Sequence, residues 1–400
     1  MAQRRQTVLR GKTQTANFKR IQGRKKTGVG RDYYDYNLLA AVILLTCFGL
    51  VMLYSTSAYE ATITFGSDMY YFTRQALISI ASLVMVLIFS QFDYHIYAKF
   101  STFIYGVAVF LLFITEFVGT TINGARRWIY IGSLSFQPAE LAKLAVILFL
   151  PCMIIKIGSK MQGFKAPAMV LGFGGVAALF TYAFTDNLST GIIIAGITVV
   201  LIFVAHPKTK PFVWMAAGGA GLVGALVWYL SKSAMNPSGS FRLRRIMVWL
   251  NPQEYASEGG YQVMQGLYAI GSGGLFGKGL GNSTQKLGAL PEAQNDMIFS
   301  IVCEELGVFG AAMVILLFVF LLYRLFFIAQ NAPDLLGSLI VTGIFVHISL
   351  QVILNIAVVI NLIPTTGITL PFVSYGGTSI VFLMAEMTLA LSVSKRIEFK

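Results

Sequence analysis

The chain has 400 residues, of which 56% are hydrophobic and only 12% are charged. Soluble domains carry roughly 25% charged residues, so the composition excludes a soluble enzyme, a disordered protein and a disulfide-rich secreted fold. It indicates an all-α polytopic membrane protein. The net charge of +13 does not indicate nucleic-acid binding, because residues 1–31 hold ten of the 30 cations and no acid. The rest of the chain is therefore nearly neutral.

The basic segment 1–34 is poor in large apolar residues, which predicts a disordered cytoplasmic tail. After it, the chain contains about ten apolar runs, each near the roughly 20 residues that cross a bilayer as a helix. The predicted spans are 36–54, 71–90, 98–118, 140–157, 167–185, 188–205, 211–230, 296–327, 336–360 and 374–393. An even number of spans places both termini in the cytoplasm, with a short second tail at 394–400.

Loop charge predicts the same orientation, because cytoplasmic loops favour Lys and Arg. The loops 55–70 and 361–373 contain neither residue and are predicted to lie outside, whereas 158–166 and 206–210 carry lysines and are predicted to lie inside. The segment 231–295 then forms one large extracytoplasmic loop between the seventh and eighth spans. Loops of this length are usually functional.

Five arginines depart from the charge rule and are predicted on the outer face. They are Arg126, Arg127, Arg242, Arg244 and Arg245. Guanidinium groups match phosphate oxygens in shape and charge, so this set suggests a site for a diphosphate headgroup. Contact with anionic lipid headgroups is the alternative.

Asp296 is predicted at the outer mouth of the eighth span, between Leu290-Pro-Glu-Ala-Gln-Asn295 and an apolar run. A partly desolvated carboxylate has a raised pKa, which suits a general base near neutral pH. A cap at the start of the helix is the alternative.

Other charges within or between spans have two readings each. Glu140 and Lys143 share a helix face and can pair, either as a structural ion pair or as part of a cavity. Asp186 either caps the sixth span or has a functional role. Glu304 and Glu305, roughly 12 Å further along the helix from Asp296, are either functional or used for packing.

Nucleotide and metal sites are not indicated. The glycine-rich stretch 271–281 has Ser272 where a Walker loop needs glycine, and Gly279 follows Lys278 in place of Ser or Thr. The scattered cysteines and histidines do not match the spacing of a metal site.

Six motifs follow one another along the membrane body. They are Asn123-Gly-Ala-Arg-Arg-Trp128, Phe136-Gln-Pro-Ala-Glu-Leu-Ala-Lys143, Gly260-Tyr-Gln262, Gly277-Lys-Gly-Leu-Gly281, Leu290-Pro-Glu-Ala-Gln-Asn-Asp-Met-Ile-Phe-Ser-Ile301 with Glu304-Glu-Leu-Gly307, and Pro371-Phe-Val-Ser-Tyr-Gly-Gly-Thr-Ser379. In these motifs the sequence resembles the SEDS family of bacterial shape, elongation, division and sporulation proteins (FtsW, RodA and SpoVE).

Within that family, Gly281-Asn-Ser-Thr-Gln-Lys286 and Pro291-Glu-Ala293 are more similar to the division branch, FtsW, than to the elongation branch, RodA. The sporulation branch stays open. The chain departs from the family in reading Gln294-Asn-Asp-Met297 where His-Thr-Asp-Phe is usual, although the aspartate is retained. The surroundings of Asp186 also depart from the family pattern.

The resemblance implies a ten-span peptidoglycan glycosyltransferase that polymerises lipid II, a disaccharide-pentapeptide on undecaprenyl diphosphate, during cell division. Asp296 would be the general base, and one base suffices for an inverting displacement. The residues expected to bind the substrate are Arg126, Arg127, Glu140, Lys143, Asp186, Arg244, Arg245, Gln262, Lys278 and Ser374. A divalent cation, Mg or Mn, stays open as a cofactor.

The implied partners are a class B penicillin-binding protein with transpeptidase activity and other division proteins, and no nucleic acid. The implied location is the bacterial cytoplasmic membrane at the division septum. Two alternative functions stay open at this point. One is a lipid II flippase, and the other is a scaffold that recruits a transpeptidase.

Overall fold

The computed structural model describes residues 33–122, 125–132, 134–207, 212, 221 and 241–398. All but the last two residues of the predicted tail 1–34 lie outside these ranges. So do the predicted span 211–230, apart from Phe212 and Gly221, and the first ten residues of the predicted outer loop.

The described part is a bundle of long apolar helices, which confirms the polytopic all-α class. Eight of them are long and apolar enough to cross a membrane, and a shorter apolar helix, α14, joins them. Their bounds are α2 (Tyr36–Phe65), α3 (Tyr70–Phe89), α5 (Ser101–Val118), α6 (Pro138–Ile157), α7 (Lys165–Thr185), α8 (Leu188–Ala205), α12 (Ile298–Asn331), α13 (Leu335–Val359) and α14 (Ser379–Ser394). These helices correspond to nine of the ten predicted spans, and the total of ten stays a prediction.

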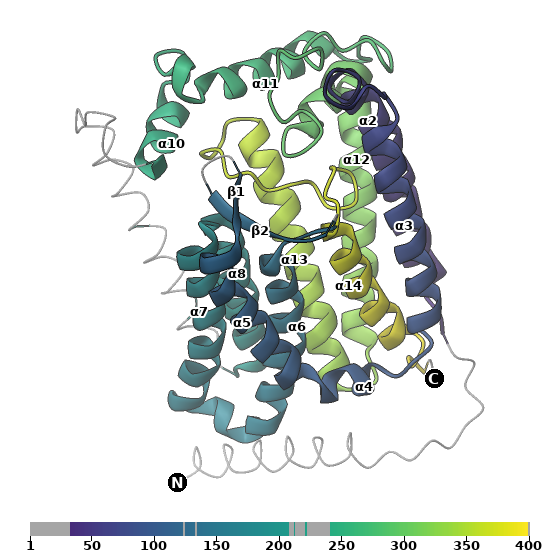
Figure 1. Cartoon of the computed structure of the whole chain (residues 1–400). Helices are drawn as coiled ribbons and strands as arrows, with labels where there is room; N and C mark the ends of the chain where they lie inside the picture. Colours follow the sequence, from purple (N-terminus) through teal and green to yellow (C-terminus); the bar gives the residue numbers. More distant parts are fainter. Residues whose placement is uncertain are drawn as a thin grey trace.

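Short elements close the two ends of the bundle (Figure 1). The helix α4 (Tyr94–Lys99) and the 3-10 turn η1 (Gly158–Gln162) lie at the predicted inner side. The helices α10 (Phe241–Leu250) and α11 (Gly260–Gly273), with η2 (Ala256–Glu258) between them, cover the opposite end. The large outer loop is therefore partly helical in its described residues.

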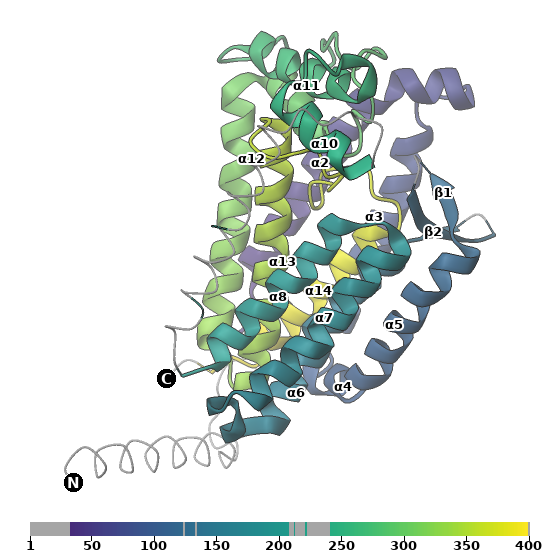
Figure 2. The same ribbon diagram turned by 90° about the vertical axis from the view of Figure 1, so that its left-hand side faces the viewer.

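A small antiparallel sheet was not predicted. It consists of β1 (Thr120–Ile122), β2 (Ala125–Ile131) and β3 (Leu134–Phe136), with β2 in the centre. Figure 2 shows β1 and β2 at the outer end of α5. The run Trp-Ile-Tyr-Ile in β2 is rich in residues that favour strands. Strands this short are much shorter than a membrane span, so they leave no mark in the pattern of long apolar runs.

Two helix ends also differ from the prediction. The first span continues as α2 to Phe65, eleven residues past its predicted end, and stops at Gly66 with φ +71. At about 1.5 Å per residue it is longer than the hydrocarbon layer is thick, so its outer end protrudes. The last span begins at Ser379 and not at residue 374.

The helix α12 is broken at Gly307, which has φ +66 and ψ −164. The outer loop inserts its backbone at this break. The amides of Lys278 and Gly279 donate to the carbonyls of Glu304 and Glu305, each at 2.9 Å. Beyond the break, Val308 N donates to Gly274 O at 3.0 Å. The kink thus exchanges helical hydrogen bonds for bonds to the loop.

The side chains of Glu304 and Glu305 strengthen the same junction. Glu304 pairs with Lys278 at 2.6 Å, and Glu305 pairs with Lys286 at 2.7 Å. Ser283 donates to Glu304, and Ser55 donates to Glu305 at 2.7 Å. Both carboxylates are fully buried. Of the two readings that the sequence left open for these acids, the structure supports the packing role.

We predict that Gly307→Ala destabilises the protein, because a Cβ there would lie 2.4 Å from Gly277 N and the backbone has a conformation open almost only to glycine. A side chain in such a conformation costs about 1–3 kcal/mol. The matched control is Gly271→Ala, whose Cβ would meet nothing within 4 Å. Thermal unfolding of the purified protein in detergent measures the difference. Equal melting temperatures for the two variants would contradict the role of the glycine junction.

Candidate functional site

Asp296 lies just before α12, but it does not cap the helix. The N-cap residue is Met297, and no side chain makes a cap hydrogen bond there. The Oδ1 atom of Asp296 is buried and has no hydrogen-bond partner in the described part of the chain. Its backbone carbonyl accepts a hydrogen bond from Asn355 Nδ2 at 2.8 Å. The capping alternative is therefore wrong, and the carboxylate has an unused acceptor atom.

Burial and the negative charge of Glu292 raise the pKa of Asp296 to about 7, and Arg245 and Arg127 pull it in the opposite direction. The two arginines do not compensate for the loss of water around the carboxylate. Asp296 thus exchanges protons near neutral pH, as a general base requires.

Arg127 projects from β2 toward the same place. A Cβ built on Gly367 would lie 3.6 Å from Arg127 Nη1 and 3.9 Å from Asp296 Oδ2, so the two side chains flank this glycine. Arg127 Nη2 donates to the carbonyl of Asp186 at 3.1 Å, while its Nε is buried without a partner among the described residues. Burial and the charge of Arg245 lower the pKa of Arg127, against the pull of Asp186 and Asp296.

The side chains of Arg126 and Arg127, which are adjacent in β2, lie on opposite faces of the strand. Successive side chains of a strand point to opposite faces, and Arg126 pairs with Glu116 at 3.1 Å on an exposed surface. Arg245 in α10 donates to the carbonyl of Thr365 at 3.1 Å. The side chains of Arg242 and Arg244 lie outside the described part of the structure.

Asp186 ends α7 in the left-handed region, with φ +48. The cap of the sixth predicted span is its neighbour Asn187, whose side chain accepts from Thr190 N. The carboxylate of Asp186 does not serve as this cap, and its charge acts on Arg127.

Glu140 and Lys143 form the predicted pair at 2.9 Å. The Lys143 side chain is only 2% exposed and also donates to Gln351 Oε1 at 3.1 Å. It therefore offers almost no surface to a ligand, and the pair shapes the site from within the bundle.

The other three predicted binding residues contact the protein itself. Gln262 Nε2 donates to the carbonyl of Pro291 at 3.4 Å, close to Asp296 in sequence. Lys278 Nζ forms an ion pair with Glu304 Oε1. Ser374 is buried, and its Oγ accepts from Leu370 N at 2.8 Å.

Sequence reasoning missed three residues of the site, namely Glu292, Asn355 and Gly367. A polar Asn355 within an apolar span was a usable signal, because such residues are rarely without a role. Glu292 and Gly367 gave no such signal, since the effect of the Glu292 charge on Asp296 and the place of Gly367 beside it depend on how the loops fold.

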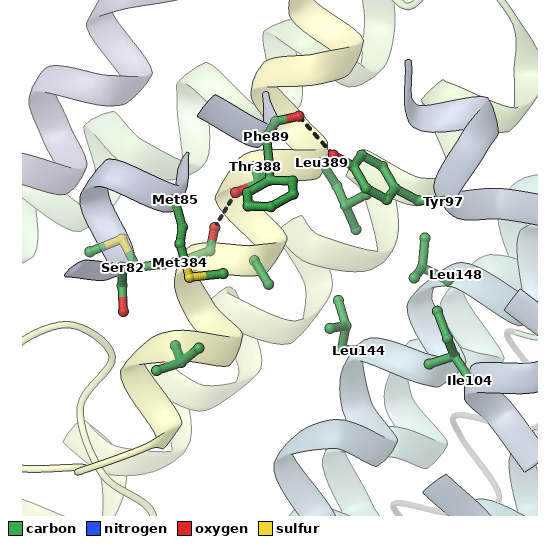
Figure 3. A pocket seen from close by; sticks show the side chains of 12 residues that line it. Ser82, Met85, Phe89, Tyr97, Ile104, Leu144, Leu148, Met384, Thr388 and Leu389 are labelled. Carbon is green, nitrogen blue, oxygen red and sulfur yellow. Dashed lines mark hydrogen bonds between the residues drawn. The ribbon is translucent and has the colours of Figure 1, made fainter. Parts of the chain in front are cut away.

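An apolar cavity of about 230 Å³ lies deeper in the bundle (Figure 3). The helices α3, α4, α5, α6 and α14 line it, and none of the lining residues belongs to the cluster around Asp296. Among the side chains that line it are Met85, Phe89, Ile104, Leu144, Met384 and Leu389.

The chain matches the family model of FtsW, RodA and SpoVE, described as cell cycle protein, over residues 35–398. It is 38% identical to stage V sporulation protein E of Bacillus subtilis, over 90% of this chain and 97% of that protein. It is 37% identical to the probable peptidoglycan glycosyltransferase FtsW of the same organism, over 92% of each.

A solved structure has a similar fold, with a TM-score of 0.74 and 26% identity over 90% of this chain and 97% of that one. It is described as showing structural coordination of polymerization and crosslinking by a peptidoglycan synthase complex. With the family model covering nearly all of the membrane body, this chain belongs to the FtsW/RodA/SpoVE family of multi-pass membrane proteins and is an FtsW-like member of it.

Proposed function

We propose that this chain, a peptidoglycan glycosyltransferase like its named relatives, polymerises lipid II with Asp296 as the general base. The observation that carries this proposal is the buried, unbonded Oδ1 of a carboxylate whose pKa is raised to about 7, placed beside two arginines. A base and a cationic pair are the two parts that sugar transfer from a lipid diphosphate requires.

In the proposed reaction, the 4-hydroxyl oxygen of the acceptor sugar attacks the anomeric carbon of the donor. The bond between that carbon and the diphosphate oxygen breaks, and the hydroxyl proton moves to Asp296. A single displacement of this kind inverts the anomeric centre and needs one base and no protein nucleophile.

Arg127 and Arg245 then stabilise the negative charge that develops on the departing diphosphate. Arg127 is well suited to this role because its buried Nε has no partner among the described residues and can donate to a phosphate oxygen. Arg244 stays a candidate on sequence alone. Arg126 is a weaker candidate, since it is paired with Glu116 on an exposed surface.

A resident divalent cation does not fit these residues well. The described chain holds no group of three His, Cys, Asp or Glu side chains placed to bind a metal. The charges of Arg245 and Arg127 also act on the carboxylate of Asp296, and they repel a cation there. We therefore derive no step through a metal.

The apolar cavity can take part of the polyprenyl tail of such a substrate. Its lining is almost wholly hydrocarbon, so the tail exchanges lipid contacts for van der Waals contacts with the lining side chains. The tail would then hold the lipid while the diphosphate reaches the arginines.

We also propose a transpeptidase partner and a place at the division septum. The similar solved structure belongs to a complex that coordinates polymerization and crosslinking, and crosslinking of new strands is transpeptidase chemistry. Membership in a family described as cell cycle protein supports a role in division.

We predict that Asp296→Asn lowers polymer formation by about 100-fold or more, the range that a general base supplies. Purified protein incubated with labelled lipid II, with products separated on a gel, measures this. The control is Glu116→Gln, which loses only an exposed pair with Arg126 and should leave activity unchanged. Full polymerisation by Asp296→Asn would overturn the assignment, and transfer of lipid II across vesicles without polymer would indicate a flippase.

The rate kcat/KM should rise with pH through about 7, because only the deprotonated form of Asp296 accepts a proton. Removing the charge of Glu292 with Glu292→Gln lowers the pKa of Asp296. The acid limb of the profile should then move to lower pH, and an unmoved limb would mean that Glu292 does not act on the base.

Ala385→Phe, which places a ring in the apolar cavity, should raise KM for lipid II with a long prenyl tail several-fold, because the ring takes volume that the tail would fill. It should have little effect with a short-tailed analogue. Leu77→Phe on the lipid-facing side of α3 is the control. Equal effects on both substrates would contradict a tail site in the cavity.

A further inference from the structure

The helix α13 carries a row of polar side chains on one face. His347, Gln351 and Asn355 follow one another at intervals of four residues, so they line up along the helix. They are 1%, 4% and 0% exposed. Polar groups inside a membrane protein are costly unless they are paired, so the row needs an explanation.

The orientation of the Gln351 amide is dictated by its neighbours. Lys143 Nζ lies 3.1 Å from Gln351 Oε1 and can only donate, while Thr369 O lies 3.0 Å from Gln351 Nε2 and can only accept. A flipped amide would place a donor against the lysine and an oxygen against the carbonyl. The oxygen of Gln351 therefore faces Lys143, and its amino group holds Thr369.

This orientation determines where the protons of His347 lie. His347 Nε2 is 2.8 Å from the same Gln351 Oε1, which can only accept, so Nε2 carries a hydrogen. His347 Nδ1 is 2.8 Å from Glu386 Oε2. The proton between them belongs either to an imidazolium facing a carboxylate or to a carboxylic acid facing a neutral ring. In both states the pair is neutral overall, and Nε2 donates.

The row ends at the backbone beside Asp296. Gln351 holds the carbonyl of Thr369, and Asn355 Nδ2 donates both to Ile368 O at 2.7 Å and to Asp296 O. The same stretch contains Gly367, which lies against Asp296 and Arg127. The amides of α13 thus set the position of residues 365–369, which we call the cover segment.

We propose that His347 is a positioning residue, which donates its Nε2 hydrogen to Gln351 and so fixes the amide that holds the cover segment over Asp296. This inference rests on the proposed role of Asp296 in catalysis. His347 does not contact the substrate in this proposal, and it acts through Gln351. Glu386 has the lesser task of keeping the ring in place, and any neutral group that donates to Nδ1 can replace it.

The test compares His347→Phe and Gln351→Glu with the matched control Glu386→Gln. The first variant removes the Nε2 donor while filling the space. The second keeps the acceptor for Lys143 and His347 but cannot donate to Thr369. The control keeps a side-chain amide that can donate to Nδ1, so Nε2 still carries its hydrogen.

The first readout is hydrogen exchange of the backbone amides in residues 362–375, which does not depend on activity. In both test variants it should accelerate by about fivefold or more, as expected when one buried hydrogen bond is lost. In Glu386→Gln it should match the unaltered protein. A purely structural role for the row predicts instead that breaking the His347–Glu386 pair is as harmful as removing His347.

The second readout is the pH profile of kcat/KM with lipid II. A loosened cover segment admits water to Asp296, so the acid limb should move to lower pH although Glu292, Arg127 and Arg245 are unchanged. The rate at pH 8 should fall by about tenfold or more, since small misplacements at a reacting centre are costly.

Unchanged exchange and an unmoved acid limb in both test variants, with Asp296→Asn inactive, would overturn the role of His347 alone. An active Asp296→Asn would overturn the proposed function. In that case the exchange measurement still decides whether His347 and Gln351 hold the cover segment.

Discussion

The structure depends on one stretch of irregular backbone at the end of the helix bundle where Asp296 lies. Residues 364–370 have no regular secondary structure, and such backbone is tolerated in a membrane protein only where the protein itself satisfies it. Four side chains from three helices bind its carbonyls, namely those of Arg245, Ser189, Asn355 and Gln351. The requirement to pair this backbone draws α8, α10 and α13 together around the site.

The same stretch accounts for the electrostatics of the site. Gly367, with φ +70, lies between Asp296 and Arg127: a Cβ there would be 3.6 Å from Arg127 Nη1 and 3.9 Å from Asp296 Oδ2. Desolvation raises the pKa of Asp296 more than the two arginines lower it. The proposed site therefore combines a carboxylate whose pKa is about 7 with two arginines. A direct ion pair between them would lower that pKa and occupy the guanidinium groups proposed to bind the diphosphate.

The outer loop is held by a second arrangement of buried charge, at the break in α12. There Glu304 and Glu305 are saturated by lysines and hydroxyl groups, whereas Asp296 keeps an unbonded oxygen. Three acids within ten residues thus differ in role because their surroundings differ. Full pairing indicates a structural junction, whereas an unused acceptor beside two arginines supports the proposed role of Asp296 as a general base.

The sequence alone determined the membrane class and most of the spans, because hydropathy is a local property. It also proposed Asp296 as the base, from the position of a lone carboxylate before a span. It did not separate Arg127 from Arg126, and it left open whether Glu304 and Glu305 are functional or used for packing. Those distinctions arise from contacts between residues that lie apart in the chain, such as Arg127 with Asp186, or Glu304 with Lys278. Helix packing and the path of the loops decide such contacts, and only the tertiary structure specifies both, since spacing along one chain does not encode which faces of different helices meet.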